Sequence, residues 1–377
     1  MSHYPPGRAL AGHPGSDTTS RMSLLDHERR ATLPGPGRSR GDDASPYDRF
    51  AERSLAGGTL SRTEARSILG APDEALPALL RSAFRVREQF WGRRVKLCLL
   101  KNARSGLCPE DCGYCSQSAV SSADIESYRL LPHEQVVAGA ENAVARGARR
   151  YCMVTSGRGP SERDIDQLCD VTREIKQRHP ELEICVSLGL MDEAQARRLA
   201  AAGVGWVNHN LNTSERFYPR ICSTHTYADR VATVLAAKRA GLHTCCGGII
   251  GMGEEDEDVL DLGFALRELG VDSLPLNFLH AIPGTPLGDR PAVGAGRALR
   301  ALCLMRFLNP AADIRAAGGR ERTLGEWQSL VLYPANSIFI DGYLTTPGQA
   351  AAEARRMVEA LGFELECEES GLGAAAQ

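Results

Sequence analysis

Long apolar runs are absent from this chain of 377 residues. No stretch reaches the roughly 18 apolar residues that a membrane span needs, so we predict no contact with a membrane. An excess of basic charge is absent as well, because the formal net charge is −3 and gives no field that draws the chain to nucleic acid. Lysine is scarce beside arginine, a bias that we attribute to a GC-rich genome.

An export signal is also absent, because no apolar stretch with a small-residue cleavage site opens the sequence. We therefore expect a cytoplasmic protein. Cysteine, in contrast, is abundant, with twelve residues. In a chain that is not exported, clustered cysteines favour metal ligation or catalysis over disulfides.

The chain divides into four segments. Residues 1–45 are rich in Gly, Pro, Ser and Arg without periodicity, which predicts a disordered tail, and their acidic residues argue against a transit peptide. Residues 46–93 show helical periodicity and should form a helical lead-in. We expect a barrel over residues 94–365 and a flexible C-terminal tail over residues 366–377.

Short apolar runs of strand length alternate with helical patterns through the predicted barrel. This alternation predicts parallel strands with right-handed crossovers, and eight such units match a TIM-type (β/α)8 barrel. The alternative is an open doubly wound sheet, which the absence of a GxGxxG fingerprint after the first strand disfavours. The eight runs are Lys96–Leu100, Tyr151–Thr155, Glu183–Ser187, Trp206–Leu211, Thr244–Ile250, Ser273–Leu279, Asp313–Ala316 and Ser337–Ile340.

Three cysteines directly after the first predicted strand have the spacing CxxxCxxC: Cys108, Cys112 and Cys115. Three thiolates on one loop can hold three irons of a [4Fe–4S] cluster and leave the fourth iron open for a ligand. Structural zinc is the alternative, but it usually takes four ligands, and neither a second CxxC nor an HxxxH lies nearby. The loop therefore predicts a catalytic iron–sulfur cluster.

A second group of cysteines lies inside predicted strands: Cys152, Cys185 and Cys245, with Arg315 early in the seventh strand. Inward-pointing residues at similar heights on different strands converge on one interior layer. One buried cysteine alone is most simply core packing, but a buried arginine needs a negative partner, which a thiolate-ligated cluster supplies. Cys246 follows Cys245, and only one of the two points inward.

The cysteine loop "CPEDCGYCSQS" resembles that of the radical S-adenosylmethionine superfamily, and five further motifs are similar to the biotin synthase family. The resemblance spans about residues 55–365 and implies the conversion of dethiobiotin to biotin. It implies that the open iron of the [4Fe–4S] cluster binds S-adenosylmethionine, and that a [2Fe–2S] cluster on Cys152, Cys185, Cys245 and Arg315 donates the sulfur. The five motifs are "VNHNLNTS", "GGIIGMGE", "LPLNFLHAIPGTPL", "IRAAGGRE" and "ANSIFIDGYLTT".

The resemblance also assigns ligand contacts. For S-adenosylmethionine it implies Tyr114, Asn212, Ile250 and Glu254. For the ureido ring of dethiobiotin it implies Asn210, with Asn277 as a second candidate. Some members carry Asp at the position of Asn212, so the amide here is a neutral partner for a ribose hydroxyl. The family's order of cysteine, small residue and glycine favours Cys245 over Cys246.

The family further implies a flavodoxin or ferredoxin as electron donor, and a homodimer. Three alternatives would differ from this function in ways that can be observed. Another radical enzyme of this fold, such as a mutase or maturase, needs only the cysteine loop. An iron–sulfur electron carrier does not turn over S-adenosylmethionine, and a zinc-binding interaction module purifies colourless.

The other cysteines are assigned to the core or the surface: Cys98, Cys169, Cys222, Cys303 and Cys367.

Overall fold

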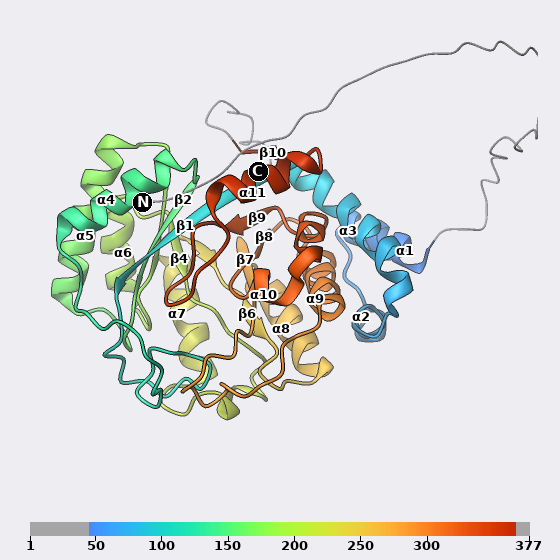
Figure 1. Cartoon of the computed structure of the whole chain (residues 1–377), viewed down its shortest axis with the longest axis horizontal. Helices are drawn as coiled ribbons and strands as arrows, with labels where there is room; N and C mark the ends of the chain where they lie inside the picture. The colour runs from blue at the N-terminus through green and yellow to red at the C-terminus, as the bar shows by residue number, and fades with distance from the viewer. Residues whose placement is uncertain (1–44, 367–377) are drawn as a thin grey trace, which may run out of the picture. The chain divides into compact units, whose positions relative to one another are not determined.

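Figure 1 shows the computed structural model, which describes residues 45–366. The tails predicted for residues 1–45 and 366–377 lie outside the described residues, apart from their innermost positions, and so does Cys367. None of the helices in the described range combines the length and apolarity that a membrane crossing needs.

In the described part of the chain, parallel strands close into a barrel with eight strand positions, which we call staves. This confirms the predicted (β/α)8 fold. β1 pairs with β9 to close the ring, β5 and β6 together form the fifth stave, and β10 pairs with the start of β1. The strands are β1 (Arg94–Arg104), β2 (Arg150–Thr155), β3 (Glu183–Ser187), β4 (Trp206–Asn208), β5 (His243–Cys245), β6 (Gly248–Ile250), β7 (Ser273–Phe278), β8 (Asp313–Ala316), β9 (Ser337–Phe339) and β10 (Glu364–Leu365).

The fifth stave differs from the prediction, because Thr244–Ile250 forms two strands broken at Cys246 and Gly247. Gly247 passes so close to β7 that a Cβ atom on it would lie 1.9 Å from the carbonyl oxygen of Pro275. Pro275 has no N–H, so β7 offers no ladder donor at this point. The glycine thus allows the fifth stave to approach the backbone of β7 closely at Pro275.

The fourth stave is shorter than predicted, since β4 ends at Asn208 within the expected range Trp206–Leu211. Beyond this point the chain stays beside the fifth stave through an isolated bridge, in which the N–H of Asn212 donates to the carbonyl of Gly247 (3.1 Å) and the carbonyl of Asn212 accepts from the N–H of Ile249 (2.8 Å). The polar side chains after β4 are therefore presented by irregular backbone rather than by a continuous strand.

Helices surround the barrel, and Cys169 and Cys303 lie as predicted in the core between the two layers. The surrounding helices are α4 (His133–Ala145), α5 (Glu162–Arg178), α6 (Glu193–Ala202), α7 (Tyr227–Arg239), α8 (Asp256–Leu269), α9 (Ala295–Leu308), α10 (Arg320–Leu324) and α11 (Ala351–Ala360). The lead-in helices α1 (Pro46–Leu55), α2 (Arg62–Leu69) and α3 (Leu76–Trp91) pack against α9 (Figure 1). Short 3-10 turns cover Asp73–Ala75, Tyr218–Arg220 and Gly325–Leu332.

Gly247→Ala should lower the free energy of unfolding by about 3 kcal/mol or more, because the added methyl group has to displace backbone rather than a side chain. Gly205→Ala is the matched control, since its Cβ would lie 4.0 Å from the nearest atom, the carbonyl oxygen of Ile184. The control should change stability by about 0.5 kcal/mol or less. Urea unfolding followed by circular dichroism measures both, and equal stability of the two variants would contradict the close approach.

Candidate active site

The three cysteines of the loop after β1 line one cavity at the C-terminal end of the barrel. Cys108, Cys112 and Cys115 share it with residues that follow the ends of β2, β4, β7 and β9, and its volume is about 390 Å³. Cys112 is buried and the other two are partly exposed. Active sites of (β/α)8 barrels lie at this end, because the loops there converge on the barrel axis. We call this end the mouth.

Two acidic residues inside the cysteine motif, Glu110 and Asp111, fasten the loop to residues 222–225. Asp111 accepts hydrogen bonds from the backbone N–H groups of Ser223 (2.9 Å) and Thr224 (3.2 Å). Partial burial opposes the charged carboxylate, but the hydrogen bonds from Ser223 outweigh it and hold the pKa of Asp111 below its ordinary range. The sequence analysis assigned no role to these two residues.

Glu110 begins a buried chain of contacts that continues into the barrel. Its carboxylate accepts a hydrogen bond from His225 Nδ1, and His225 Nε2 accepts one from Arg230 (2.9 Å). Arg230 sets these directions, because a guanidinium has only donors. Arg230 also donates to the carbonyl oxygen of Asn210 (2.9 Å). The cysteine loop and the end of the fourth stave therefore share one network.

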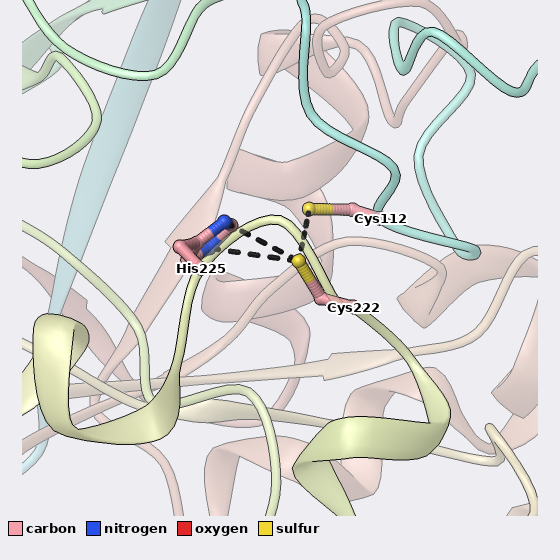
Figure 2. Close-up of side chains that lie close together, drawn as sticks. All are labelled: Cys112, Cys222 and His225. Carbon is pink, nitrogen blue, oxygen red and sulfur yellow. Dashed lines mark hydrogen bonds between the residues drawn. The ribbon is translucent and has the colours of Figure 1, made fainter.

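Cys222 is a site residue that the sequence analysis missed. Its Sγ atom lies 3.7 Å from Cys112 Sγ and 3.3 Å from His225 Nδ1. Figure 2 shows the three side chains pointing toward one another. The three residues offer ligand atoms within 4.8 Å of one another, a spacing that a metal ion could use. However, Nδ1 carries the proton that is donated to Glu110, and a protonated ring nitrogen does not ligate. We therefore assign no metal ion to this trio.

The predicted cofactor contacts Tyr114 and Asn212 meet in the cavity. Asn212 Nδ2 donates to the Tyr114 hydroxyl (2.6 Å), and both residues line the cavity. Asn212 has a φ of 70°, a left-handed conformation that asparagine tolerates better than most residues. Its backbone carbonyl accepts a hydrogen bond from the N–H of Ile249 (2.8 Å). The amide thereby reaches the tyrosine from a fixed position beside β6.

The other two predicted cofactor contacts, Ile250 and Glu254, lie outside the cavity lining, whereas Ile249 is part of it. Ile250 is buried in the main hydrophobic core. The carboxylate of Glu254 accepts hydrogen bonds from the N–H groups of Gly251 (2.7 Å) and Gly253 (3.0 Å) in its own turn. Their contacts with the cofactor stay predictions.

The predicted substrate contacts Asn210 and Asn277 both line the cavity and also brace the strand ends. Asn210 Oδ1 accepts from the N–H of Gly247 (3.0 Å). Asn277 Nδ2 donates to the carbonyl of Gly248 (3.1 Å), and its Oδ1 accepts from the N–H of Gly318 (2.9 Å). A side-chain amide has two donor hydrogens and two acceptor lone pairs, so each keeps capacity for a ligand.

The second predicted set of residues converges at the inner end of the cavity, which Cys152 lines, on a layer that we call the floor. Cys152 and Cys185 lie opposite each other on β2 and β3, and their shared hydrogen bond lowers the pKa of Cys152 and raises that of Cys185. On β5, Cys245 accepts a hydrogen bond from Arg315 Nη1 (3.4 Å). All four side chains are buried. Three thiols and one guanidinium thus meet at one level.

Arg315 stays charged at this level although it is fully buried. Burial opposes the charge, but attraction to the negative charge on its neighbours, Cys98 and Cys245 as thiolates and Asp313 as a carboxylate, outweighs it and holds the pKa of Arg315 well above its ordinary value. Nε donates to the hydroxyl of Ser337 (2.9 Å), and Nη2 donates to the carboxylate of Asp313 (3.3 Å). The guanidinium is therefore fixed on one edge, and its Nη1 faces the floor thiols.

Cys98 and Cys246 lie on opposite sides of the barrel wall. Cys98 Sγ lies 3.5 Å from the Ser337 hydroxyl, so this cysteine belongs to the floor. Its parity in the sequence is the signal that could have found it, because it shares a face of β1 with Leu100, which lines the cavity. Cys246 lies in the main hydrophobic core, so Cys245 is the member of the adjacent pair that faces the floor.

Below the floor, charged residues close the barrel. Arg150 Nε donates to Glu183 (2.7 Å), and its guanidinium lies 3.6 Å from the centre of the Trp206 ring. Arg150 also pairs with Asp313 (3.3 Å), and Lys96 pairs with Glu183 (2.9 Å). Arg150 and Lys96 are both buried, so this end of the barrel is filled and the cavity opens at the mouth.

Comparisons with known proteins agree with this arrangement. The chain matches the Radical SAM superfamily over residues 104–264 and the Biotin and Thiamin Synthesis associated domain over residues 275–364. A biotin synthase of Bacillus subtilis (strain 168) is 50% identical over 317 residues, 84% of this chain and 94% of that protein. A biotin synthase of Thermus thermophilus is 51% identical over 321 residues, 84% of this chain and 96% of that protein.

Among solved structures, a methylornithine synthase superposes on this chain with a TM-score of 0.74. The match covers 84% of this chain and 97% of that one, at 20% sequence identity. At this identity the likeness is one of fold alone.

Asp111→Asn should loosen the cysteine loop, because the variant loses the negative charge and replaces the oxygen that accepts from the N–H and hydroxyl of Ser223 by an NH2 donor. We expect a loss of about 1–3 kcal/mol of stability and a lower iron content, measured by thermal unfolding and iron analysis. Because the pKa of Asp111 is depressed, the difference from wild type should be complete above about pH 4 and shrink only below it.

Asp170→Asn is the matched control, since Asp170 lies exposed on α5 and pairs only with Arg173 in its own helix (2.7 Å). It should retain the wild-type iron content and lose about 0.5 kcal/mol of stability or less. An equal loss of iron in both variants would contradict the anchoring role of Asp111.

Proposed function

The chain belongs to the biotin synthase family of the radical S-adenosylmethionine superfamily, and from this premise we propose how its residues insert sulfur into dethiobiotin to form biotin. The protein is a radical S-adenosylmethionine sulfurtransferase. Acid–base groups cannot take hydrogen from a saturated carbon, so the protein positions cofactors and excludes water. The observation that carries the proposal is the presence of two separate thiol sets in one barrel, at the mouth and on the floor.

At the mouth, Cys108, Cys112 and Cys115 hold a [4Fe–4S] cluster, and its fourth iron is left for S-adenosylmethionine. When bound, this cluster supplies the electron that cleaves S-adenosylmethionine into methionine and a 5′-deoxyadenosyl radical. The donor set fits, because three thiols from one loop face one cavity. Glu110 and Asp111 keep the thiols at the mouth, where a flavodoxin or ferredoxin can approach the partly exposed loop.

S-adenosylmethionine lies between the mouth and the floor. Tyr114 faces the adenine, and Asn212 offers its amide to a ribose hydroxyl. The hydrogen bond between these two side chains holds both in place before the ligand arrives. Ile250 and Glu254 contribute from the glycine-rich turn after β6, where the backbone can approach a ligand closely.

Dethiobiotin lies deeper in the same cavity. Its ureido ring has two N–H donors and one carbonyl acceptor, which match side chains that carry both an oxygen and an NH2 group. Asn210 and Asn277 supply such groups from opposite sides of the fifth stave. Because both amides are braced by backbone bonds, they orient the substrate without moving.

On the floor, Cys152, Cys185, Cys245 and Arg315 hold a [2Fe–2S] cluster, which supplies the sulfur atom when bound. The donor set fits, since thiolates beside a buried guanidinium carry the negative charge that it needs. Ser337 holds the Nε edge of Arg315, and the Nη1 atom therefore faces the cluster position. Two further features, a homodimer and a cytoplasmic location, rest on the family alone.

Anaerobically reconstituted protein should contain about six irons per chain, and the Cys152→Ala, Cys185→Ala double variant about four, because only the floor set is removed. Mössbauer spectroscopy with iron and sulfide analysis measures this difference. Biotin formation from dethiobiotin should be lost in the double variant. The matched control, Cys169→Ala, Cys303→Ala, removes two core thiols and should keep about six irons.

About four irons in the wild type and in the floor variant alike would contradict the inner cluster. The mouth set would then stand alone, and sulfur insertion would have no donor in this chain. Retained biotin formation in the double variant would overturn the role of the floor in the same way.

Asn212→Ala should raise the KM for S-adenosylmethionine by about tenfold, because a ribose contact and the tether on Tyr114 are both lost. Tyr114→Phe removes only the hydroxyl that Asn212 reaches and should raise KM by about threefold. Asn142→Ala, on the exposed face of α4 beside Arg146, is the control and should leave KM unchanged. Steady-state assays at varied S-adenosylmethionine give these values, and an unchanged KM in Asn212→Ala would rule out the ribose contact.

A further inference from the structure

One sulfur contact at the mouth has no role in sulfur insertion. Cys222 Sγ lies 3.7 Å from Cys112 Sγ, and Cys112 is a ligand of the proposed mouth cluster (Figure 2). We propose that in the cluster-free chain Cys112 and Cys222 form a disulfide that withholds Cys112 from iron. The proposal goes beyond the proposed function, because it assigns a modification site, and it rests on that function only in taking Cys112 as a cluster ligand.

The two sulfurs are held together by the loops that carry them. Asp111, which precedes Cys112, accepts hydrogen bonds from the N–H groups of Ser223 and Thr224, which directly follow Cys222. The N–H of Gly113 donates to the carbonyl oxygen of Ile221 (2.8 Å). The residues next to both cysteines are thus already paired, and these backbone bonds hold the two sulfurs in contact before the disulfide forms.

The bonding of Cys112 favours Cys222 over the other thiols of the mouth. In the described part of the chain, the Cys112 thiol hydrogen-bonds to Cys222 and to neither Cys108 nor Cys115. Both sulfurs of the pair are largely buried, but Cys112 lines the open cavity, which gives a small oxidant access. Once iron binds the loop, the Cys112 sulfur is occupied, and the disulfide is therefore restricted to the cluster-free state.

The oxidant is a low-molecular-weight disulfide of the glutathione type. One cysteine sulfur attacks it, forms a mixed disulfide and releases one small thiol. The second cysteine sulfur then attacks the first, which closes the Cys112–Cys222 bond and releases the second small thiol. Two electrons pass from the protein to the small disulfide, and the two protein thiol protons leave on the released thiols. A dithiol reductant of the thioredoxin type reverses both steps.

The disulfide has a defined effect on the loop. It removes one of three ligands, so iron cannot be loaded until a dithiol has reduced the bond. It also keeps the buried pair from further oxidation to sulfinic or sulfonic acid, which cannot be undone by thiols. The mouth thus returns to a loadable state after its cluster is lost.

Peptide mapping tests the pair directly. Cluster-free protein is prepared with a chelator and a reductant, incubated with oxidised glutathione and capped with N-ethylmaleimide. It is then digested without reduction and analysed by mass spectrometry. We expect a linked peptide pair that contains Cys112 and Cys222, and loss of this pair when the cluster-loaded protein is treated in the same way.

Reciprocal variants separate the pair from general thiol oxidation. Cys222→Ser should abolish the link, and Cys112→Ser should leave Cys222 alkylated. Cys169→Ser, which removes a buried thiol on α5 that contacts the carbonyl oxygen of Arg198, should leave the linked peptide in place. Because the wild-type map is informative by itself, a variant that fails to fold does not remove the test.

The proposal is overturned if both sulfurs of oxidised wild type are alkylated, or if Cys112 is linked to glutathione, Cys108 or Cys115 instead. None of these measurements uses biotin formation. A wild-type protein that shows the link but makes no biotin would therefore contradict the proposed function and leave the disulfide standing.

Discussion

The buried guanidinium of Arg315 governs the arrangement around it. A charge in a barrel core is tolerated only with partners, and Arg315 shares the carboxylate of Asp313 with Arg150. With Ser337 and Asp313 on one edge, the remaining edge faces Cys245. The barrel interior is layered accordingly. Charged side chains fill the closed end, the floor thiols lie above them, the amides of Asn210 and Asn277 come next, and the cysteine loop lies at the mouth. The cavity thereby has the cysteine loop at one end and Cys152 of the floor set at the other.

The fold could be predicted from the sequence because strands that are buried on both faces consist of nearly continuous apolar residues. Glu183–Ser187 and Asp313–Ala316 have the predicted bounds for this reason. The fifth strand was predicted as one because nothing inside Thr244–Ile250 marks the break. The break depends on the close approach of Gly247 to Pro275 of β7. Because the two residues lie in different strands, neither segment alone shows this contact.

The candidate site shows the same difference between features that lie within one segment and contacts between distant segments. The spacing of Cys108, Cys112 and Cys115 is local, so the sequence displays it, and the comparisons place this loop within the Radical SAM match. Cys222 is 110 positions from Cys112, and only the folded loops bring their sulfurs together. Ile249 rather than Ile250 lines the cavity, and this is the parity that the inward-facing Cys245 of β5 already indicates, since the two residues are four positions apart.

The filled end of the barrel has a consequence for how the enzyme is maintained. Under the proposed function the floor would give up a sulfur atom with each product, and Arg150, Glu183 and Lys96 fill the end of the barrel opposite the mouth. Replacement iron and sulfide would then enter where the cavity opens, at the mouth. Substrate binding and cluster repair would share that one entrance.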